Sequence, residues 1–331
     1  MRPVRRRMRS VFSACLDRVA DDAAMELTSQ EMPLPTVCVM MSVYNGAAYL
    51  REQIDSILLQ EGVDVRLIIR DDGSTDEAPR ILASYDDHRV RFFSGPNLGI
   101  AESFMEVAFA ATTDCDYYAF SDADDVWEPR KLIAGVEALR PLGAEPALFG
   151  TRVKFVDEKL RFLGMGDSLS RWHGFGHSLV HTGIGGATSV LNREMFALLR
   201  SARPKMFIMH DAWLYMLATG LARIVFSEES AILYRQHGRN ASGASRHFRK
   251  RWRARWSALR ARSDPRRLQA LEMERTFGDR MDADKRADLA RFAHHDDSVA
   301  ARIAFLFRNP LVFHTTRARL FYLLRVALFR T

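Results

Sequence analysis

The 331-residue sequence has few cysteines and no long apolar runs. Cys15, Cys38 and Cys115 form neither a CxxC pair nor a zinc-ligand spacing, which argues against a disulfide framework and a structural zinc site. Such cysteine usage favours a reducing cytosol. No uninterrupted apolar stretch reaches the ~18 residues of a membrane-spanning helix, and no signal-peptide core follows the arginine-rich N-terminus. We therefore expect a cytoplasmic protein that does not span a bilayer.

Two phosphate-binding loops are also missing. The sequence has no GxxxxGK[ST] motif, and no GxGxxG follows the first predicted strand. These absences argue against an ATPase and against a nicotinamide-dependent dehydrogenase. The composition is otherwise that of a globular protein, with 47% hydrophobic and 27% charged residues.

Charge is divided unevenly along the chain. Residues 245–331 contain 21 Lys and Arg against nine Asp and Glu, whereas residues 1–244 contain 27 against 32. An acidic body followed by a basic tail indicates two different partners. We divide the chain into a basic N-terminal extension (1–35), a catalytic domain (36–244) and a basic helical tail (245–331).

Short apolar runs alternate with helical periodicity in the central part of the chain. The runs predict strands at residues 37–41, 65–69, 90–93, 117–120, 148–156 and 232–235. Apolar residues recurring every three or four positions predict helices at residues 50–58, 75–83, 100–111 and 211–219. Such alternation predicts an α/β fold with a mostly parallel central sheet flanked by helices.

Polar clusters follow three of the predicted strands, where ligands bind in open α/β sheets. They are Tyr44-Asn45, Asp71-Asp72-Gly73-Ser74 and the run from Ser121 to Asp125. A solvated turn is the alternative for each, since these residue types are common in turns. Three carboxylates within four residues repel one another unless a cation compensates them. Asp122 and Asp124 are therefore candidate ligands for Mg²⁺ or Mn²⁺ bridging a diphosphate.

Several motifs together resemble a known family. The segments are VMMSVYN (39–45), RDDGSTD (70–76), Asn97-Leu98-Gly99 and SDADDVW (121–127). In this order they resemble the inverting family 2 glycosyltransferases, which have the GT-A fold. HDAW (210–213) and YRQHG (234–238) are most similar to bacterial rhamnosyltransferases. The resemblance implies transfer, with inversion, of a deoxyhexose such as rhamnose from a dTDP- or UDP-sugar to a hydroxyl of a growing, lipid-linked surface polysaccharide.

The resemblance also implies roles for individual residues. The nucleotide-sugar is expected to contact Ser42, Tyr44, Asp71, Asp72, Asn97 and Asp122. A divalent metal, Mg²⁺ or Mn²⁺, is expected to bind Asp122, Asp124 and His237. Five further residues are expected to contact the acceptor or to support the metal ligands: Asp125, Trp127, His210, Trp213 and Arg235.

Asp211 occupies the position of the catalytic base in this resemblance. A carboxylate within hydrogen-bond reach can take the proton of an attacking sugar hydroxyl, and the N-terminus of the predicted helix favours its negative charge. The alternative role for Asp211 is a helix N-cap. For His237 the alternative is a hydrogen-bonded histidine that binds no metal.

The basic tail indicates contact with an anionic membrane surface. Residues 246–262 surround Trp252 and Trp256 with eight Lys or Arg, a combination that suits lipid headgroups. We expect the protein on the inner face of the cell membrane, near a lipid-linked acceptor. The alternative is a helical cap packed on the catalytic domain.

Two other function classes fit parts of the sequence. A nucleic-acid-binding protein would explain the basic tail but not the acidic clusters, so we expect no nucleic-acid partner. A sugar nucleotidyltransferase would also use Mg²⁺ and carboxylates, but it needs a glycine-rich, basic loop after the first strand, which is missing here.

Overall fold

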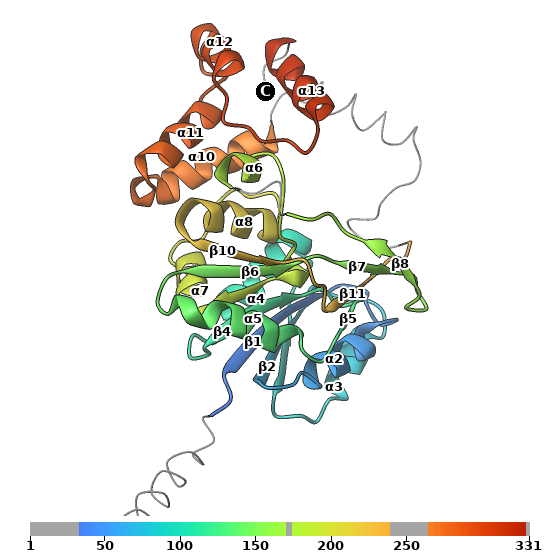
Figure 1. Cartoon of the computed structure of the whole chain (residues 1–331). Helices are drawn as coiled ribbons and strands as arrows, with labels where there is room; N and C mark the ends of the chain where they lie inside the picture. Colours follow the sequence, from blue (N-terminus) through green and yellow to red (C-terminus); the bar gives the residue numbers. More distant parts are fainter. Residues whose placement is uncertain (1–32, 170–173, 239–263, 329–331) are drawn as a thin grey trace, which may run out of the picture. The chain divides into compact units, whose positions relative to one another are not determined.

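The central feature of the structure, a computed structural model, is a twisted sheet (Figure 1). The model describes residues 33–169, 174–238 and 264–328. Within them the sheet has seven strands in the order β10-β6-β9-β4-β1-β2-β3. Their bounds are β1 (Thr36–Val43), β2 (Asp64–Asp71), β3 (Val90–Ser94), β4 (Tyr117–Ser121), β6 (Ala147–Thr151), β9 (Val190–Asn192) and β10 (Arg223–Ser227). All neighbours pair in parallel except β9, which is antiparallel to both β4 and β6.

Helices cover both faces of this sheet. One face packs against α2 (Leu50–Leu58), α3 (Ala78–Ala83) and α5 (Lys131–Leu139). The other face packs against α4 (Ile100–Ala110), α7 (Arg193–Arg200) and α8 (His210–Leu221). Strand β1 is buried on both sides, because Val39 lies in the first core and Met40 in the second. Continuous apolar runs are typical of such doubly covered parallel strands.

A small second sheet lies beside the first. Its order is β5-β11-β7-β8, with bounds β5 (Val126–Trp127), β7 (Lys154–Val156), β8 (Phe162–Met165) and β11 (Ile232–Arg235). The remaining short elements of the described segments are α6 (Phe175–Ser178) and the 3₁₀ turns η1 (Arg140–Leu142), η2 (Gly186–Thr188) and η3 (Gly278–Arg280).

Most of the predicted elements are confirmed, with three differences. The predicted helix 75–83 begins only at Ala78, and the predicted strand 148–156 is two strands, β6 and β7, in different sheets. Helices α5 and α7 and strands β9 and β10 were not predicted. The antiparallel β9 has only three residues, too short for a periodic signal in the sequence.

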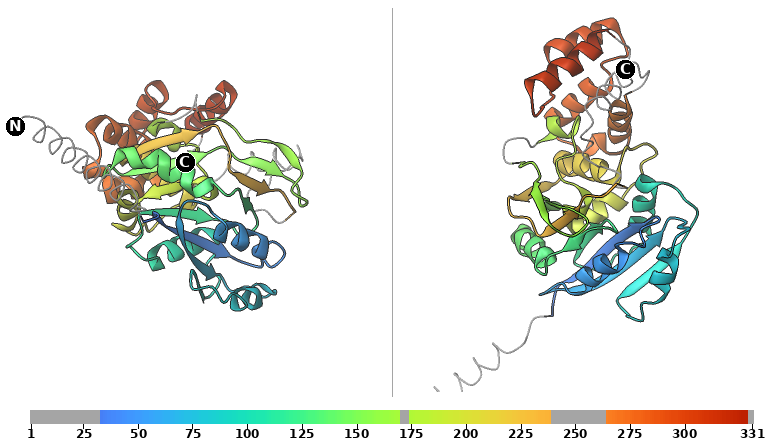
Figure 2. Two further views of the ribbon diagram at one scale, coloured as in Figure 1. Left: turned by 60° about the horizontal axis from the view of Figure 1, so that its bottom comes forward. Right: turned by 90° about the vertical axis from the view of Figure 1, so that its right-hand side faces the viewer.

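The C-terminal helices pack on the catalytic domain. They are α10 (Pro265–Phe277), α11 (Ala283–Ala293), α12 (Val299–Phe307) and α13 (Thr316–Leu328). Met273 and Phe277 of α10 and Phe292 of α11 share one hydrophobic core with Trp213 of α8, and the helices stack beyond α8 in the right-hand view of Figure 2. Phe305 of α12 and Val326 of α13 belong to the same core, so all four of these helices pack as the cap alternative describes. Trp252, Trp256 and nearly all of the extension 1–35 lie outside the described residues.

Candidate active site

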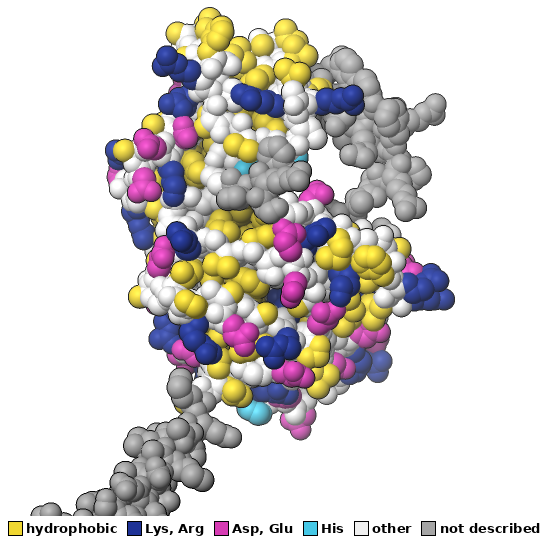
Figure 3. Space-filling view, in the orientation of Figure 1, with side chains coloured by type: hydrophobic (Ala, Val, Ile, Leu, Met, Phe, Trp, Pro, Cys, Tyr) yellow, Lys and Arg dark blue, Asp and Glu magenta, His cyan; other side chains and the backbone are white. Residues whose placement is uncertain are grey.

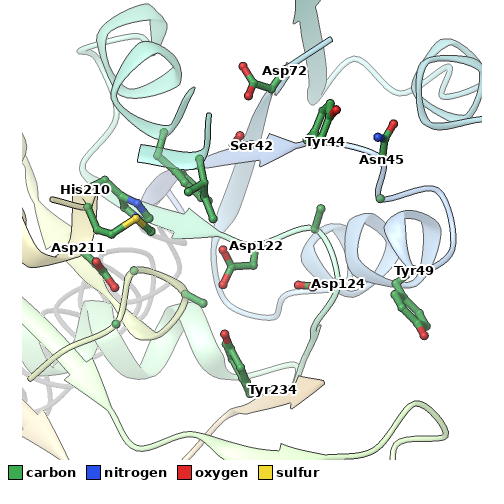
Figure 4. Close-up of a pocket in the computed structure, with 18 of the residues that line it drawn as sticks. Ser42, Tyr44, Asn45, Tyr49, Asp72, Asp122, Asp124, His210, Asp211 and Tyr234 are labelled. Atoms are coloured by element: carbon green, nitrogen blue, oxygen red, sulfur yellow. The ribbon is translucent and has the colours of Figure 1, made fainter. Parts of the chain in front are cut away.

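A cleft of about 430 Å³ opens at the carboxyl ends of β1, β2 and β4 (Figure 4). All fourteen residues predicted for the site lie in the described part of the chain. Nine line the cleft: Ser42, Tyr44, Asp72, Asn97, Asp122, Asp124, His210, Asp211 and His237. The cleft thus contains a candidate base, candidate metal ligands and candidate nucleotide contacts in one space.

Three carboxylates crowd together just after β4. One oxygen each from Asp122, Asp124 and Asp125 lies within 4.8 Å of the others. Burial, followed by the charges of Asp124 and Asp211, raises the pKa of Asp122 to about 7. Asp125 is fully buried, and its Oδ2 has no hydrogen-bond partner among the described residues. Oxygen donors that lack compensation fit a hard divalent cation such as Mg²⁺ or Mn²⁺.

His237 lies beside the acidic cluster. Its Nε2 is 2.8 Å from Asp124 Oδ2, and its ring lies 5.0 Å from the ring of Tyr49, centroid to centroid. The predicted neighbourhood of His237 and Asp124 is therefore present. An imidazole in this position can either hydrogen-bond the carboxylate or join it as a metal ligand.

Arg235 holds the acidic loop from behind. Its side chain donates to the backbone oxygens of Asp124 (2.9 Å) and Glu158 (2.8 Å) and forms an ion pair with Glu52, while its backbone N–H donates to Asp125 Oδ1 (3.0 Å). Arg235 does not line the cleft. Its hydrogen bonds position the loop that contains Asp124 and Asp125, and its expected role as a support of metal ligands stays a prediction.

A second buried cation lies near Asp125. Lys131 Nζ is 3.6 Å from the centre of the Trp127 ring, and burial lowers the pKa of Lys131 to about 7 although Asp125 raises it. Trp127 is buried and outside the cleft lining. Trp127 therefore covers Lys131, whose charge interacts with Asp125, and its role toward an acceptor or the metal ligands stays a prediction.

The opposite end of the cleft contains a buried ion pair. Arg70 and Asp72 are paired, and the Asp72 carboxylate also accepts the backbone N–H groups of Leu98 (2.9 Å) and Gly99 (3.0 Å). Arg70 also donates to Ser103 Oγ (2.8 Å). This network fixes the segment that contains Asn97. Asp72 lines the cleft, but its oxygens are already engaged by the protein.

Asp71 does not line the cleft. Its carboxylate is buried and accepts the backbone N–H of Ser74 (3.1 Å). Asp71 therefore stabilises the turn after β2. This is the turn role that was the alternative for this cluster, but the side chain is buried and not solvated. Its predicted contact with the nucleotide does not follow from this geometry.

Asp211 enters the cleft from the first turn of α8. Its Oδ1 accepts the backbone N–H of Ala212 (2.7 Å), and its charge contributes to the raised pKa of Asp122. The neighbouring His210 ring stacks on Phe104 at 3.9 Å between centroids and lies 4.9 Å from Phe120. Burial lowers the pKa of His210 to about 4, so this ring is neutral. His210 fixes the start of the helix that presents Asp211.

Other residues that line the cleft were not predicted from the sequence, and Tyr234 and the segment from Gly185 to Thr188 are among them. Burial, and then the charges of Asp122, Asp125, Asp124 and Asp211, raise the pKa of Tyr234, so its phenol stays protonated facing the carboxylates (Figure 4). The segment from Gly185 to Thr188 forms another wall. Tyr234 is the first residue of the YRQHG motif, so this motif could have identified it as a site residue.

Comparison with known proteins identifies the family. The family model described as "Glycosyl transferase family 2" matches residues 38–206, about half of the chain. The chain belongs to glycosyl transferase family 2.

Relatives of this glycosyltransferase agree with that assignment. An uncharacterized glycosyltransferase of Rickettsia typhi is 24% identical over 68% of this chain and 71% of its own. The dTDP-rhamnosyl transferase RfbG of Shigella flexneri is 24% identical over 64% of this chain and 77% of its own. The crystal structure of S. aureus TarS 1–349 in complex with UDP-GlcNAc has a TM-score of 0.55 at 15% identity, covering 88% of this chain and 79% of that one. The GT-A fold is thereby confirmed.

Trp213 needs a correction. It was expected to contact the acceptor or to support the metal ligands, but its side chain is fully buried, does not line the cleft and packs 6.3 Å from the ring of Phe277 on α10, centroid to centroid. The aspartate and the tryptophan of the HDAW motif thus point to different places, because residues two apart on a helix face different directions. In this glycosyltransferase Trp213 anchors the C-terminal helices.

His210 lies so close to Gly186 that a larger residue should destabilise the fold. A Cβ at Gly186 would lie 2.3 Å from His210 Nε2, and the ring cannot retreat between its aromatic neighbours. Gly186→Ala should lower the free energy of unfolding by about 1–3 kcal/mol, the usual cost of overpacking. Gly185→Ala is the matched control, since a Cβ there meets nothing within 4 Å. Urea denaturation of both variants checks this, and equal stabilities would contradict it.

Proposed function

We propose that this family 2 glycosyltransferase transfers a deoxyhexose such as rhamnose from a dTDP- or UDP-sugar to a hydroxyl of a growing, lipid-linked surface polysaccharide, with inversion. The observation that supports it best is the convergence of Asp211 with Asp122 and Asp124 in one cleft. A base and a diphosphate-binding centre within one cavity are what a single displacement requires.

Asp122 and Asp124, with His237 beside them, would hold Mg²⁺ or Mn²⁺. When bound, the cation offsets the negative charge that develops on the leaving diphosphate. Arg235 keeps the loop of these ligands in place through the Asp124 backbone oxygen. Tyr234 contributes a protonated phenol on the same side (Figure 4).

Asp211 would act as the general base. Its carboxylate can take the proton from the attacking hydroxyl, while the neutral His210 holds the helix start. Among the described residues that line the cleft, Asp211 is the carboxylate proposed as the base, and we assign no residue there as a nucleophile that would form a covalent intermediate. Direct displacement inverts the anomeric carbon, by the same stereochemical logic as in inverting glycosidases.

The names of similar proteins support the substrate class. One relative is described as a dTDP-rhamnosyl transferase, and one structural neighbour was solved with UDP-GlcNAc. Both point to a nucleoside-diphosphate sugar as the donor here. The HDAW and YRQHG motifs favour a deoxyhexose.

Asp124→Asn tests the metal centre. The variant should lose the Mn²⁺-dependent stabilisation by UDP or dTDP, because Asn supplies no negatively charged oxygen to the metal. In the parent, binding to the native state stabilises it by about 2.7 kcal/mol at a ligand concentration of 100 times Kd. Thermal shift with and without Mn²⁺ measures this, and circular dichroism checks the fold. Asp86→Asn is the control, since Asp86 is exposed and lies outside the cleft lining. Unchanged metal-dependent nucleotide binding in Asp124→Asn would show that Asp124 is not a ligand.

Asp211→Asn tests the base. Turnover should fall roughly 10²–10⁴-fold, since Asn cannot accept a proton, while the affinity for nucleoside diphosphate stays as in the parent. Release of nucleoside diphosphate from dTDP-rhamnose or a UDP-sugar, with a lipid-linked glycan extract as acceptor, measures turnover. Asp284→Asn removes an exposed acidic residue from the first turn of α11 and serves as control. Near-normal turnover of Asp211→Asn would move the search for a base to His210 or His237.

We further propose that α12 and α13 bring the enzyme to the anionic inner face of the cell membrane. Each helix exposes apolar residues at i, i+4 and i+8: Val299, Ile303 and Phe307 on α12, and Leu320, Leu324 and Leu328 on α13. Exposed arginines accompany them at 308, 317 and 319, and Figure 3 shows the apolar side chains gathered at this end. Among the helices of the described segments, none combines the length and the apolar character needed to cross a bilayer.

Removing apolar side chains from both helices tests this proposal. The double variant Phe307→Ser/Leu324→Ser should bind phosphatidylglycerol vesicles at least about tenfold more weakly, because burying each large apolar side chain contributes about 1.5–3 kcal/mol. Leu59→Ser is the matched control, since Leu59 is 70% exposed at the end of α2. Vesicle sedimentation measures binding. If the double variant sediments like the parent, membrane contact lies elsewhere.

A further inference from the structure

Three histidines meet where α6 contacts the segment between α12 and α13. One ring nitrogen each from His177, His181 and His314 lies within 4.8 Å of the others. The ring centroids are 4.9 Å apart for His177 and His181, 4.9 Å for His177 and His314, and 4.5 Å for His181 and His314. None of the three lines the cleft, so the proposed transfer reaction does not use them.

The chain holds these rings together by backbone contacts. His177 and His181 are four residues apart, and the His181 N–H donates to the His177 backbone oxygen (2.9 Å), so both rings lie on one side of a helical turn. The Val312 N–H donates to the Gly176 oxygen (3.2 Å). A Cβ at Gly176 would lie only 2.0 Å from the Pro310 oxygen. Glycine there permits the approach that delivers His314.

The nitrogen atoms have the chemistry of metal ligands. His177 Nε2 and His314 Nε2 are 2.7 Å apart, and His181 Nε2 is buried with no hydrogen-bond partner among the described residues. An imidazole nitrogen is a common ligand of metal ions in proteins.

We propose that His177, His181 and His314 form a binding site for Zn²⁺ or a chemically similar divalent transition metal. Imidazole nitrogens favour this class of ion, whereas the carboxylates of the cleft favour Mg²⁺ and Mn²⁺. Zn–N bonds of about 2.0–2.1 Å place tetrahedral ligand nitrogens about 3.3 Å apart, so the rings need only small shifts.

The surroundings of the three rings match such a site. Tyr215 Oη lies 3.2 Å from His177 Nδ1 and can accept a hydrogen bond from its N–H, which leaves Nε2 as the ligand atom. Metal-binding histidines usually donate their other N–H in this way. Arg266, which donates to the Val180 backbone oxygen, is the nearby positive charge that opposes a cation. The bonds from the three imidazole nitrogens must offset the repulsion between Arg266 and the bound cation.

An ion here would join two parts of the chain far apart in sequence. His177 and His181 precede the Gly183–Thr188 segment, whose latter part lines the cleft, and His314 precedes α13. The metal would therefore fix the C-terminal helices to the catalytic domain. Because the reaction residues are not involved, this site and the proposed transfer can fail independently.

The experiment uses the untagged full chain after treatment with EDTA. Calorimetric titration with Zn²⁺ should show one site per chain that remains in Asp124→Asn, which removes one carboxylate of the acidic cluster. Co²⁺ in the same site should give the intense visible absorption of a four-coordinate ion, with three histidine nitrogens among its ligands. His181→Gln and His314→Gln should each weaken Zn²⁺ binding more than about tenfold, since even loss of an outer partner costs that much. His88→Gln changes an exposed histidine and should leave binding unchanged.

Thermal stability provides a second readout for variants that fold less well. Zn²⁺ should raise the Tm of the parent, of Asp124→Asn and of His88→Gln, but not of His181→Gln or His314→Gln, because only binding to the native state stabilises it. Absence of stoichiometric Zn²⁺ binding in the parent would overturn the proposal. So would equal binding by His181→Gln, His314→Gln and the parent, which would leave only hydrogen-bonded histidines.

Discussion

Repulsion among carboxylates is the constraint around which the cleft is organised. Asp122, Asp124 and Asp125 meet at the end of β4, where burial makes their mutual charge costly. Two basic residues on the side away from the cleft reduce this repulsion. Arg235 donates hydrogen bonds to the loop, and the buried Lys131 interacts electrostatically with Asp125. On the side of the cleft, Asp122 and Asp124 are the residues that would bind the proposed divalent cation. The same arrangement that costs stability without a ligand therefore favours a metal and an anionic diphosphate.

Helix α8 connects the reaction site to the C-terminal helices. Its first turn presents Asp211 to the cleft, and His210 is clamped there by Phe104 and Phe120. Two residues later, Trp213 packs against Phe277 of α10. One rigid element thus fixes both the carboxylate and the docking of α10. Sequence changes in the C-terminal core can for this reason affect the position of Asp211 without touching the cleft.

Much of the fold and of the site followed from local sequence patterns. The apolar run of β1 reads as a strand because both of its faces are buried, and Asp122, Asp124 and Asp211 follow predicted strand ends or begin a predicted helix. Motif order then located the cleft, since parallel strands bring their carboxyl ends to one edge. These features depend on a few neighbouring residues, which a single sequence displays.

Side-chain roles that depend on contacts between distant residues could not be predicted from the sequence in the same way. Asp71 and Asp72 are adjacent acidic residues, and only the packing of residues 97–99 decides that Asp72 lines the cleft while Asp71 holds a turn. Trp213 resembled an acceptor contact until its partner, 64 positions along the chain at Phe277, was known. His177 and His314 lie 137 residues apart and meet only because Gly176 admits the Pro310 backbone. In each case the role of the side chain depends on a long-range contact, and such a contact leaves no periodic pattern in the sequence.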